Sequence, residues 1–145
     1  MSATRAEARA SYAIKAEVRD PHAQYWFFAM QKTMYGGKRI AEGDVVYVFA
    51  SENQGGSGLI SRGIVTAGEP TPPKKGAARQ TPRVSITVKR LEAAKRRLGR
   101  AQLKPFANWD DGRPETELNF KLYRQATNKI VALSHEAAAF LETFF

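Results

Sequence analysis

Short apolar runs separated by turn residues predict a chain made mainly of β-strands. Some runs are continuous and rich in aromatic and β-branched side chains, which is typical of buried strands. In others, hydrophobic and polar residues alternate, which is the period of a strand with one buried face. The predicted strands are 24–30, 44–50, 59–66, 84–89, 118–122 and 130–131. Residues 11–19 fit either a short helix or a strand.

Two segments have helical patterns. Residues 91–98 predict a short basic helix, because Gly99 follows them at the position of a left-handed C-terminal cap. Near the end of the chain, Ser134 precedes a run whose apolar side chains share one helical face, so we expect a final helix capped by Ser134.

Glycine and proline mark the connections between these elements. Residues 51–58 form a Gly-rich connection, and 33–40 fit a loop or one helical turn. Residues 68–82 contain four prolines and no core-forming pattern, so we expect an exposed loop there. A further loop is expected at 105–114.

The length of 145 residues and the 43% hydrophobic content fit one domain with a single core. We expect a flexible tail at 1–11 and one domain at 12–145. Its fold class is α+β and mainly β: a curled sheet or small barrel with short helices and a C-terminal helix. The chain has no cysteine, which excludes disulfide scaffolds and thiolate metal sites. Because it has neither a secretory signal nor an apolar run of membrane length, we expect a cytoplasmic protein.

Positive charge is concentrated in one part of the chain. The whole sequence has 23 Lys and Arg against 14 Asp and Glu, a net charge of +9. Between Lys74 and Lys104 eleven basic residues accompany one acid, so the remainder is nearly neutral. Such a segment attracts polyanions, although a solvated helix face with a basic loop gives the same count. The candidate phosphate-binding residues are Lys74, Lys75, Arg79, Arg83, Lys95, Arg96, Arg97 and Arg100.

The residues that usually carry catalysis or bind metal are few. The two histidines, His22 and His135, are far apart and lack acidic or histidine neighbours at ligand spacing. The sequence contains neither a nucleophile elbow nor a phosphate-binding loop with its lysine. We therefore expect no metal, no cofactor and no enzymatic activity, although a constellation of Lys, Thr and Glu stays open.

Aromatic and amide side chains at strand ends and in loops point to base recognition. A base outside a duplex needs ring faces for stacking and fixed donors and acceptors along its edge. The candidate residues are Trp26, Phe28, Trp109 and Tyr123 for stacking, and Ser51, Asn53, Gln125 and Asn128 for the base edge. Trp26 and Phe28 share one face of a strand and fit a plain core equally well, and Asn128 fits a turn cap.

Three segments are similar to the opening of the EVE domain, a member of the PUA-like superfamily. They are "QYWFFAM", "IAEGDVVYVFAS" and "GLISRGIVTAGEP", and the end of the chain, "LYRQATNKIVALSHEAAAFLETFF", resembles the close of such domains. The resemblance spans about residues 22–145, although each motif by itself is common to many PUA-like and ASCH domains.

The resemblance implies a five- or six-stranded PUA-like pseudobarrel that holds a flipped, often modified base in an aromatic pocket. It places Trp26 at the pocket wall, Ser51 as a hydrogen-bonding partner of the base, and Asn53 as a polar contact. The chain departs from the family in one place: "QKTMYGGKRI" replaces the usual Gly-Val-Arg-Asn segment. A second pocket residue therefore has no counterpart, which leaves the identity of the base open.

The leading hypothesis is a monomeric module that binds DNA or RNA and no membrane, with one base in a pocket beside a basic surface. One alternative is an ASCH-like hydrolase that acts on a modified nucleoside or an amide through a lysine and a carboxylate. Another is a protein-binding module that uses the apolar end of the last helix, Phe140, Phe144 and Phe145.

Overall fold

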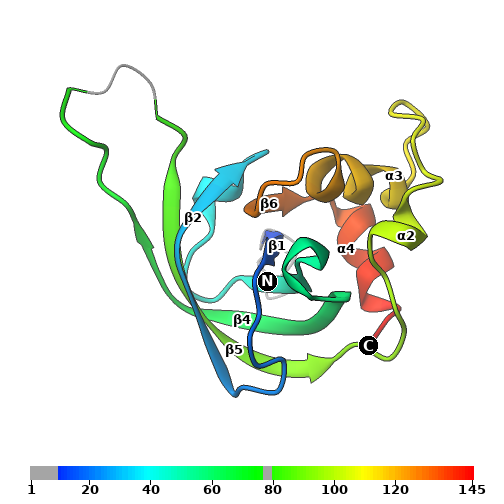
Figure 1. Cartoon of the computed structure of the whole chain (residues 1–145), viewed down its shortest axis with the longest axis horizontal. Coiled ribbons are helices and arrows are strands. Elements are labelled where there is room, and N and C mark those ends of the chain that lie inside the picture. The colour runs from blue at the N-terminus through cyan, green and yellow to red at the C-terminus, as the bar shows by residue number, and fades with distance from the viewer. Residues whose placement is uncertain (1–9, 77–79) are drawn as a thin grey trace, which may run out of the picture.

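The computed structural model describes residues 10–76 and 80–145 of the chain. Six strands form a closed barrel in the order β1-β3-β4-β5-β2-β6 (Figure 1). The strands are β1 (Ser11–Ala16), β2 (Tyr25–Met34), β3 (Val45–Ala50), β4 (Gly58–Pro70), β5 (Arg83–Ala93) and β6 (Lys129–Leu133). The barrel is mixed, because β1 is parallel to β3 and β2 is parallel to β6, whereas the other neighbours are antiparallel.

This architecture confirms the predicted pseudobarrel with a C-terminal helix. β1 begins at Ser11, so the open choice between helix and strand for 11–19 is decided in favour of a strand. Most of the predicted flexible tail, residues 1–9, lies outside the described residues.

Two hydrophobic clusters lie on the two sides of the sheet. Inside the barrel, side chains such as Ile14, Val48 and Ile86 are fully buried. Outside it, neighbouring residues of the same strands, such as Ala13 and Phe49, are fully buried beneath helices. β1 and β3 are therefore covered on both faces, which is why their sequences are nearly continuous apolar runs.

The helices gather on one side of the barrel, at the right of Figure 1. They are α2 (Arg100–Leu103), α3 (Pro114–Leu118), the π-helix η3 (Asn119–Tyr123) and α4 (His135–Glu142), with short 3-10 turns η1 (Gly37–Arg39) and η2 (Glu52–Gln54) elsewhere. The predicted cap of α4 is confirmed, since Ser134 Oγ accepts a hydrogen bond from the Ala137 N–H at 3.1 Å. No helix in the described part of the chain is long and apolar enough to cross a membrane.

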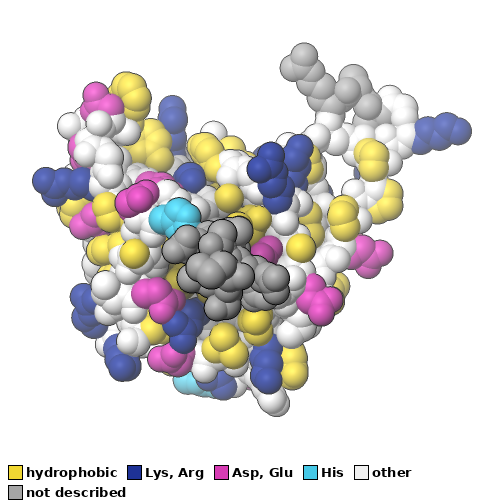
Figure 2. Space-filling model, turned by 180° about the vertical axis from the view of Figure 1, so that it is seen from behind, with side chains coloured by type: hydrophobic (Ala, Val, Ile, Leu, Met, Phe, Trp, Pro, Cys, Tyr) yellow, Lys and Arg dark blue, Asp and Glu magenta, His cyan; other side chains and the backbone are white. Residues whose placement is uncertain are grey.

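β4 and β5 continue beyond the barrel as a long hairpin, here called the arm. It extends to the upper left of Figure 1, and Figure 2 shows it standing clear of the body with basic side chains on it. The prediction of a loop from residue 68 onward is wrong at its start, because β4 continues to Pro70, which pairs with Val84. Pairing with β5 stabilises this extension where the local sequence alone shows only turn residues.

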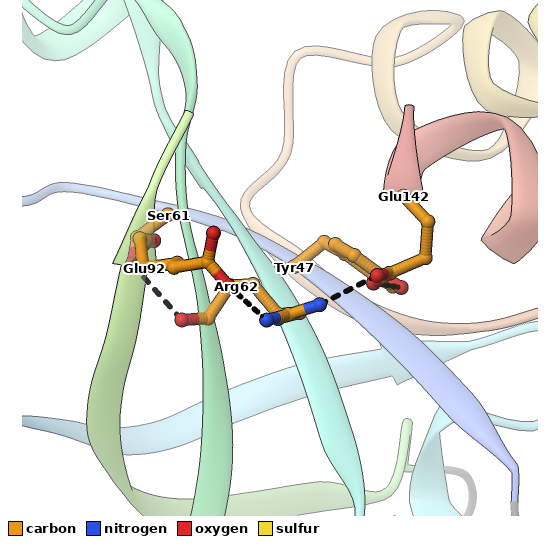
Figure 3. A network of polar contacts seen from close by, with 5 residues as sticks. All are labelled: Tyr47, Ser61, Arg62, Glu92 and Glu142. Atoms are coloured by element: carbon orange, nitrogen blue, oxygen red, sulfur yellow. Dashed lines mark hydrogen bonds and ion pairs between the residues drawn. The ribbon is translucent and has the colours of Figure 1, made fainter. Parts of the chain in front are cut away.

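A polar network fastens α4 to the barrel wall (Figure 3). The Arg62 guanidinium of β4 forms ion pairs with Glu92 of β5 and Glu142 of α4. Tyr47 of β3 donates its hydroxyl hydrogen bond to the same Glu142 carboxylate. Burial and this hydrogen bond raise the pKa of Tyr47, so the phenol remains a neutral donor.

The aromatic end of the chain packs against this network. Phe144 is buried and meets Phe140 edge to face, with ring centroids 5.3 Å apart. The Arg96 guanidinium lies 4.2 Å from the Phe144 ring centroid, and that of Arg62 lies 5.5 Å from the Phe145 centroid. The residues that the protein-binding alternative needs at the surface are thus engaged with this chain.

The predicted basic helix at 91–98 is wrong. β5 continues through Ala93, which pairs with Ser61 of β4, and Gly99 precedes α2 instead of ending a helix. Gly99 has extended backbone, and a Cβ there would lie 2.5 Å from the Glu52 carboxylate. The glycine therefore serves a close approach of two segments and does not provide a left-handed turn.

The predicted strand at 118–122 is also wrong, because these residues are helical. Leu118 ends α3 and Leu122 lies in η3, four positions later and on the same face, and both are fully buried. Phe120, which lies between them, is only half-buried. Three alternating apolar residues fit both periods, and here packing on the barrel selects the helix.

Candidate functional site

The first half of β2 borders a slit in the barrel. β2 pairs with β5 from Tyr25 onward, but it meets β6 through two pairs, Thr33 with Ile130 and Met34 with Val131. A cavity of about 560 Å³ lies beside residues 25–31, which pair with no strand on this side in the described part of the chain. Its other walls come from residues 16–20, which are the end of β1 and the segment after it, and from Gln54 and Asn128.

Trp26 and Phe28 point into the barrel and line this cavity. They are 7% and 5% exposed, and their ring centroids lie 6.3 Å apart. The Trp26 indole donates a hydrogen bond to the Asp20 carbonyl at 2.9 Å, which fixes the ring beside the segment that follows β1. The two rings are thus both core and cavity wall, so these two interpretations of the sequence are compatible.

Other predicted base-pocket residues lie around the turn η2. Ser51 is buried and precedes η2, and its N–H donates to the Ala16 carbonyl at 2.8 Å; it is not part of the cavity wall. At the cavity edge, Asn128 Nδ2 donates to Gln54 Oε1 at 2.7 Å. Within the described residues, this pair leaves Asn128 Oδ1 and Gln54 Nε2 without a further protein partner.

The Glu52 carboxylate links the turn η2 to the helices α2 and η3 through hydrogen bonds. Glu52 accepts hydrogen bonds from the Tyr123 hydroxyl at 3.0 and 3.2 Å and from the Arg100 N–H at 2.7 Å. The Arg100 guanidinium also donates to Asn53 Oδ1 at 3.0 Å. Burial and the Glu52 charge raise the pKa of Tyr123, so its hydroxyl remains a donor. Tyr123 and Arg100 therefore hold η2 in place beside the cavity.

Two buried lysines, which sequence reasoning missed, lie behind η2. Lys15 of β1 and Lys129 of β6 are paired across the sheet, and each is 1% exposed. Their ammonium groups donate to one acceptor, the Gln125 carbonyl, at 3.3 and 3.2 Å. Burial, followed by the charge of Lys129, lowers the pKa of Lys15 to about 8, and burial also lowers that of Lys129. The sequence signal was present, since each lysine interrupts or borders an apolar run.

Trp109 is the predicted base-pocket residue that the structure places elsewhere. It is 74% exposed and lines a different cavity, of about 810 Å³, on the helical side. Tyr35 and Phe120 share that cavity, and Tyr123 contributes to its wall. The other seven predicted residues lie at the slit or around η2.

The predicted phosphate-binding residues fall into two groups at opposite ends of the molecule. Lys74 and Arg83 line a groove of about 920 Å³ at the base of the arm, which also contains Met30, Lys32 and Lys38. Residues 95–100 lie at the lower right of Figure 1, near the end of α4.

The remaining members of the two groups are placed as follows. Lys75 is exposed beside Lys74 on the arm, and Arg79 lies outside the described residues. Lys95 and Arg97 are exposed, whereas Arg96 stacks on Phe144 and donates to the Thr143 carbonyl at 2.8 Å. Arg100, at the start of α2, is the member of this group that contacts η2.

Among residues 10–76 and 80–145, no three His, Cys, Asp or Glu side chains gather as a metal site would need. The polar residues that line the slit are the amides Gln31, Gln54 and Asn128 and the charged residues Glu17, Arg19 and Asp20. Such groups can hydrogen-bond a flat heterocycle that inserts beside Trp26.

Comparison with known proteins relates this barrel to solved structures. No family model matches the sequence, and no curated protein matches it. Human thymocyte nuclear protein 1, solved in complex with DNA containing 5-methylcytosine, aligns with a TM-score of 0.63 at 15% identity, over 92% of this chain and 96% of that chain. The DUF55 domain of the same human protein gives 0.62 at 14% identity over the same shares. A protein from Pseudomonas putida gives 0.58 at 15% identity, over 92% of this chain and 98% of that one. At these identities the likeness is one of fold, and the chain has the PUA-like pseudobarrel fold of EVE (DUF55) domains that its sequence motifs predict.

Proposed function

We propose that this chain binds nucleic acid and holds one base, unmodified or modified, in the slit between β1 and β2. The observation that carries the proposal is the cavity of about 560 Å³, which has Trp26 and Phe28 on its wall and the amides of Gln54 and Asn128 at its edge. Small-ligand sites combine apolar or aromatic surface with convergent polar groups, and here the polar groups make up the larger share of the lining.

The polar groups of the slit suit a base that has left its stack. A flipped base is held by stacking on an aromatic face and by hydrogen bonds along its edge. Asn128 Oδ1 offers an acceptor and Gln54 Nε2 a donor, and the amide pair holds both in place. The net charge of +9 and the arm, whose basic residues line a groove farther along β2, support contact with phosphates.

The fold comparison supports the same ligand class. Human thymocyte nuclear protein 1, which has this barrel, is solved with DNA that contains 5-methylcytosine. Methylated cytosine is therefore the first modified base to test on this chain, beside unmodified cytosine and methylated adenine.

The test uses tryptophan fluorescence of the Trp109→Phe variant, in which Trp26 is the single tryptophan. This variant is titrated with short single-stranded and duplex oligonucleotides that carry each of these bases, at two salt concentrations. A base stacked beside Trp26 should quench its emission in a saturable way, with a preference among the bases that persists when salt weakens phosphate contacts.

The Trp26→Phe variant, which retains Trp109, is the matched control. It should bind the oligonucleotides through phosphates but should show no base-dependent quenching. Oligonucleotide binding that leaves the emission of Trp26 unchanged for every base would refute a base in the slit.

A hydrolase is a second candidate, and Lys15 is the observation that favours it. A lysine with a pKa of about 8 releases its proton far more readily than an ordinary lysine, so a minor fraction is neutral amine near neutral pH, and the charge of Glu52 acts on it. Lys15 is, however, 1% exposed and not part of the cavity wall. Release of a new product from modified nucleosides, lost in Lys15→Met, would identify this activity.

A further inference from the structure

The outer face of β2 carries two exposed aromatic side chains that the barrel core does not use. Four aromatic residues follow one another at 25–28, and the pleat turns Trp26 and Phe28 inward. Tyr25 and Phe27 therefore point outward, where they are 50% and 68% exposed. Large apolar side chains that gather on a surface usually mark a binding site.

The neighbours of this aromatic pair are polar. In the register of β2 and β5, Tyr25 lies opposite the exposed Lys89, and Phe27 lies opposite Thr87. A cation and a hydroxyl beside flat rings suit a ligand that has ring faces and negative charge. Nucleic acid has both, whereas an apolar protein surface would leave Lys89 without a partner in the interface.

The position of the pair connects two features of the proposed site. Tyr25 and Phe27 contribute to the rim of the slit cavity, opposite to residues 16–20. Farther along β2, Met30 is 57% exposed and Lys32 lines the groove at the base of the arm. One strand thus leads from the slit, past two exposed rings, to a basic groove.

The spacing of the rings suits separate bases. Alternate residues of a strand lie roughly 6.6 Å apart, which is too far for the two rings to stack on each other but allows each to take one base of an extended strand. Aromatic side chains on an open sheet bind single-stranded nucleic acid in this way elsewhere.

We propose that Tyr25 and Phe27 form a stacking platform for the bases that neighbour the one in the slit. The chain then binds single-stranded or locally opened nucleic acid in preference to an intact duplex, and the strand continues toward the arm. The platform rests on the proposed function for its orientation, because the slit fixes which nucleotides are the neighbours.

The test compares Tyr25→Ala/Phe27→Ala with wild type by fluorescence anisotropy, on a labelled single strand of about ten nucleotides and on its duplex. Both side chains are exposed, so the variant should unfold at the wild-type temperature. Loss of a stacked base should weaken single-strand binding by about tenfold or more for each ring, with a smaller effect on the duplex. Tyr35→Ala removes a ring of similar exposure, 47%, that directly follows β2 and lines the cavity on the helical side, and it should leave single-strand affinity near the wild-type value.

A second readout separates the platform from the slit. In the Trp109→Phe background, a single nucleotide can fill the slit but is too short to reach the platform as well. Its quenching of Trp26 should therefore persist when Tyr25→Ala/Phe27→Ala is added. Intact single-strand affinity in the double variant would overturn the platform while leaving the slit in place. Loss of affinity together with loss of concentration-dependent self-association would also overturn it, since the rings would then be a protein interface. Failure of the proposed function looks different, because the nucleotide then fails to quench Trp26 in the Trp109→Phe protein itself.

Discussion

Lys15 and Lys129 place two amines in one buried space behind η2. Each donates to the Gln125 carbonyl, and the Lys15 ammonium lies 5.1 Å from the Tyr123 ring centroid. The Glu52 carboxylate, whose charge also acts on Lys15, is held by Tyr123 and Arg100. Because burial disfavours an ammonium that lacks a carboxylate in contact, the folded state favours proton release from this pair.

The lowered pKa values predict a stability that rises with pH in the alkaline range. Lys15 titrates at about 8 when folded and at 10.5 when unfolded, so between these values the unfolded chain binds one more proton than the folded chain. The free energy of unfolding should therefore increase from about pH 8 to about pH 10, by up to about 3 kcal/mol for this residue. Lys129 acts in the same direction. Urea unfolding at a series of pH values measures the change.

Two lysine variants test the origin of this pH dependence. Lys15→Met should be more stable than wild type at neutral pH and should lose most of the rise, because it removes the buried charge and keeps a side chain of similar length. Lys104→Met removes an exposed lysine and should retain the wild-type profile. A wild-type stability that falls steadily between pH 8 and 10 would contradict the burial of a charged amine.

At the scale of elements, local patterns predicted the barrel strands, because their apolar periods arise from burial on the sheet. The same logic failed where two periods coincide, as at Leu118 and Leu122, and where pairing with β4 extends β5 through a basic sequence. The slit could not be predicted, because it depends on how far β2 pairs with β6, a contact between distant segments. Trp26, Phe28 and Asn128 were identified as candidates, but the two lysines became evident only when β1 and β6 were paired.

Next to the short contact between β2 and β6, Gly37 packs closely against the β6 backbone. This close approach leads to a prediction. A Cβ at Gly37, in η1, would lie 2.1 Å from the Ile130 carbonyl oxygen of β6. Gly37→Ala must push η1 away from β6 and should destabilise the protein by roughly 1–3 kcal/mol. Gly68→Ala is the control, since its Cβ would meet no atom closer than 3.6 Å. Equal unfolding midpoints in urea for the two variants would show that η1 does not hold this junction.

At the scale of the whole molecule, one basic segment of the sequence becomes two separate surfaces. The arm holds Lys74 and Lys75 at one end, where Lys74 lines the groove that β2 reaches. At the other end, the Lys95 N–H donates to the Phe144 carbonyl at 2.7 Å, just beyond α4, and Arg97 is exposed two residues later. Proximity in sequence therefore overstated how many of these charges can contact one ligand. The course of β2 from the slit to the groove favours the arm as the surface that contacts phosphates.

Charge removal at each end distinguishes the two surfaces. Lys74→Gln/Lys75→Gln and Lys95→Gln/Arg97→Gln each remove two positive charges, so a general loss of attraction affects both equally. If the strand follows β2 to the arm, the first variant should weaken binding more than the second, and it alone should reduce the slope of log Kd against log salt by roughly 1.5, the value for two phosphate contacts. An equal reduction in both variants would mean that the ligand reaches both ends of the molecule. In that case the helical side, including Arg100 beside η2, would belong to the phosphate path, and the ligand would cross the barrel instead of following β2.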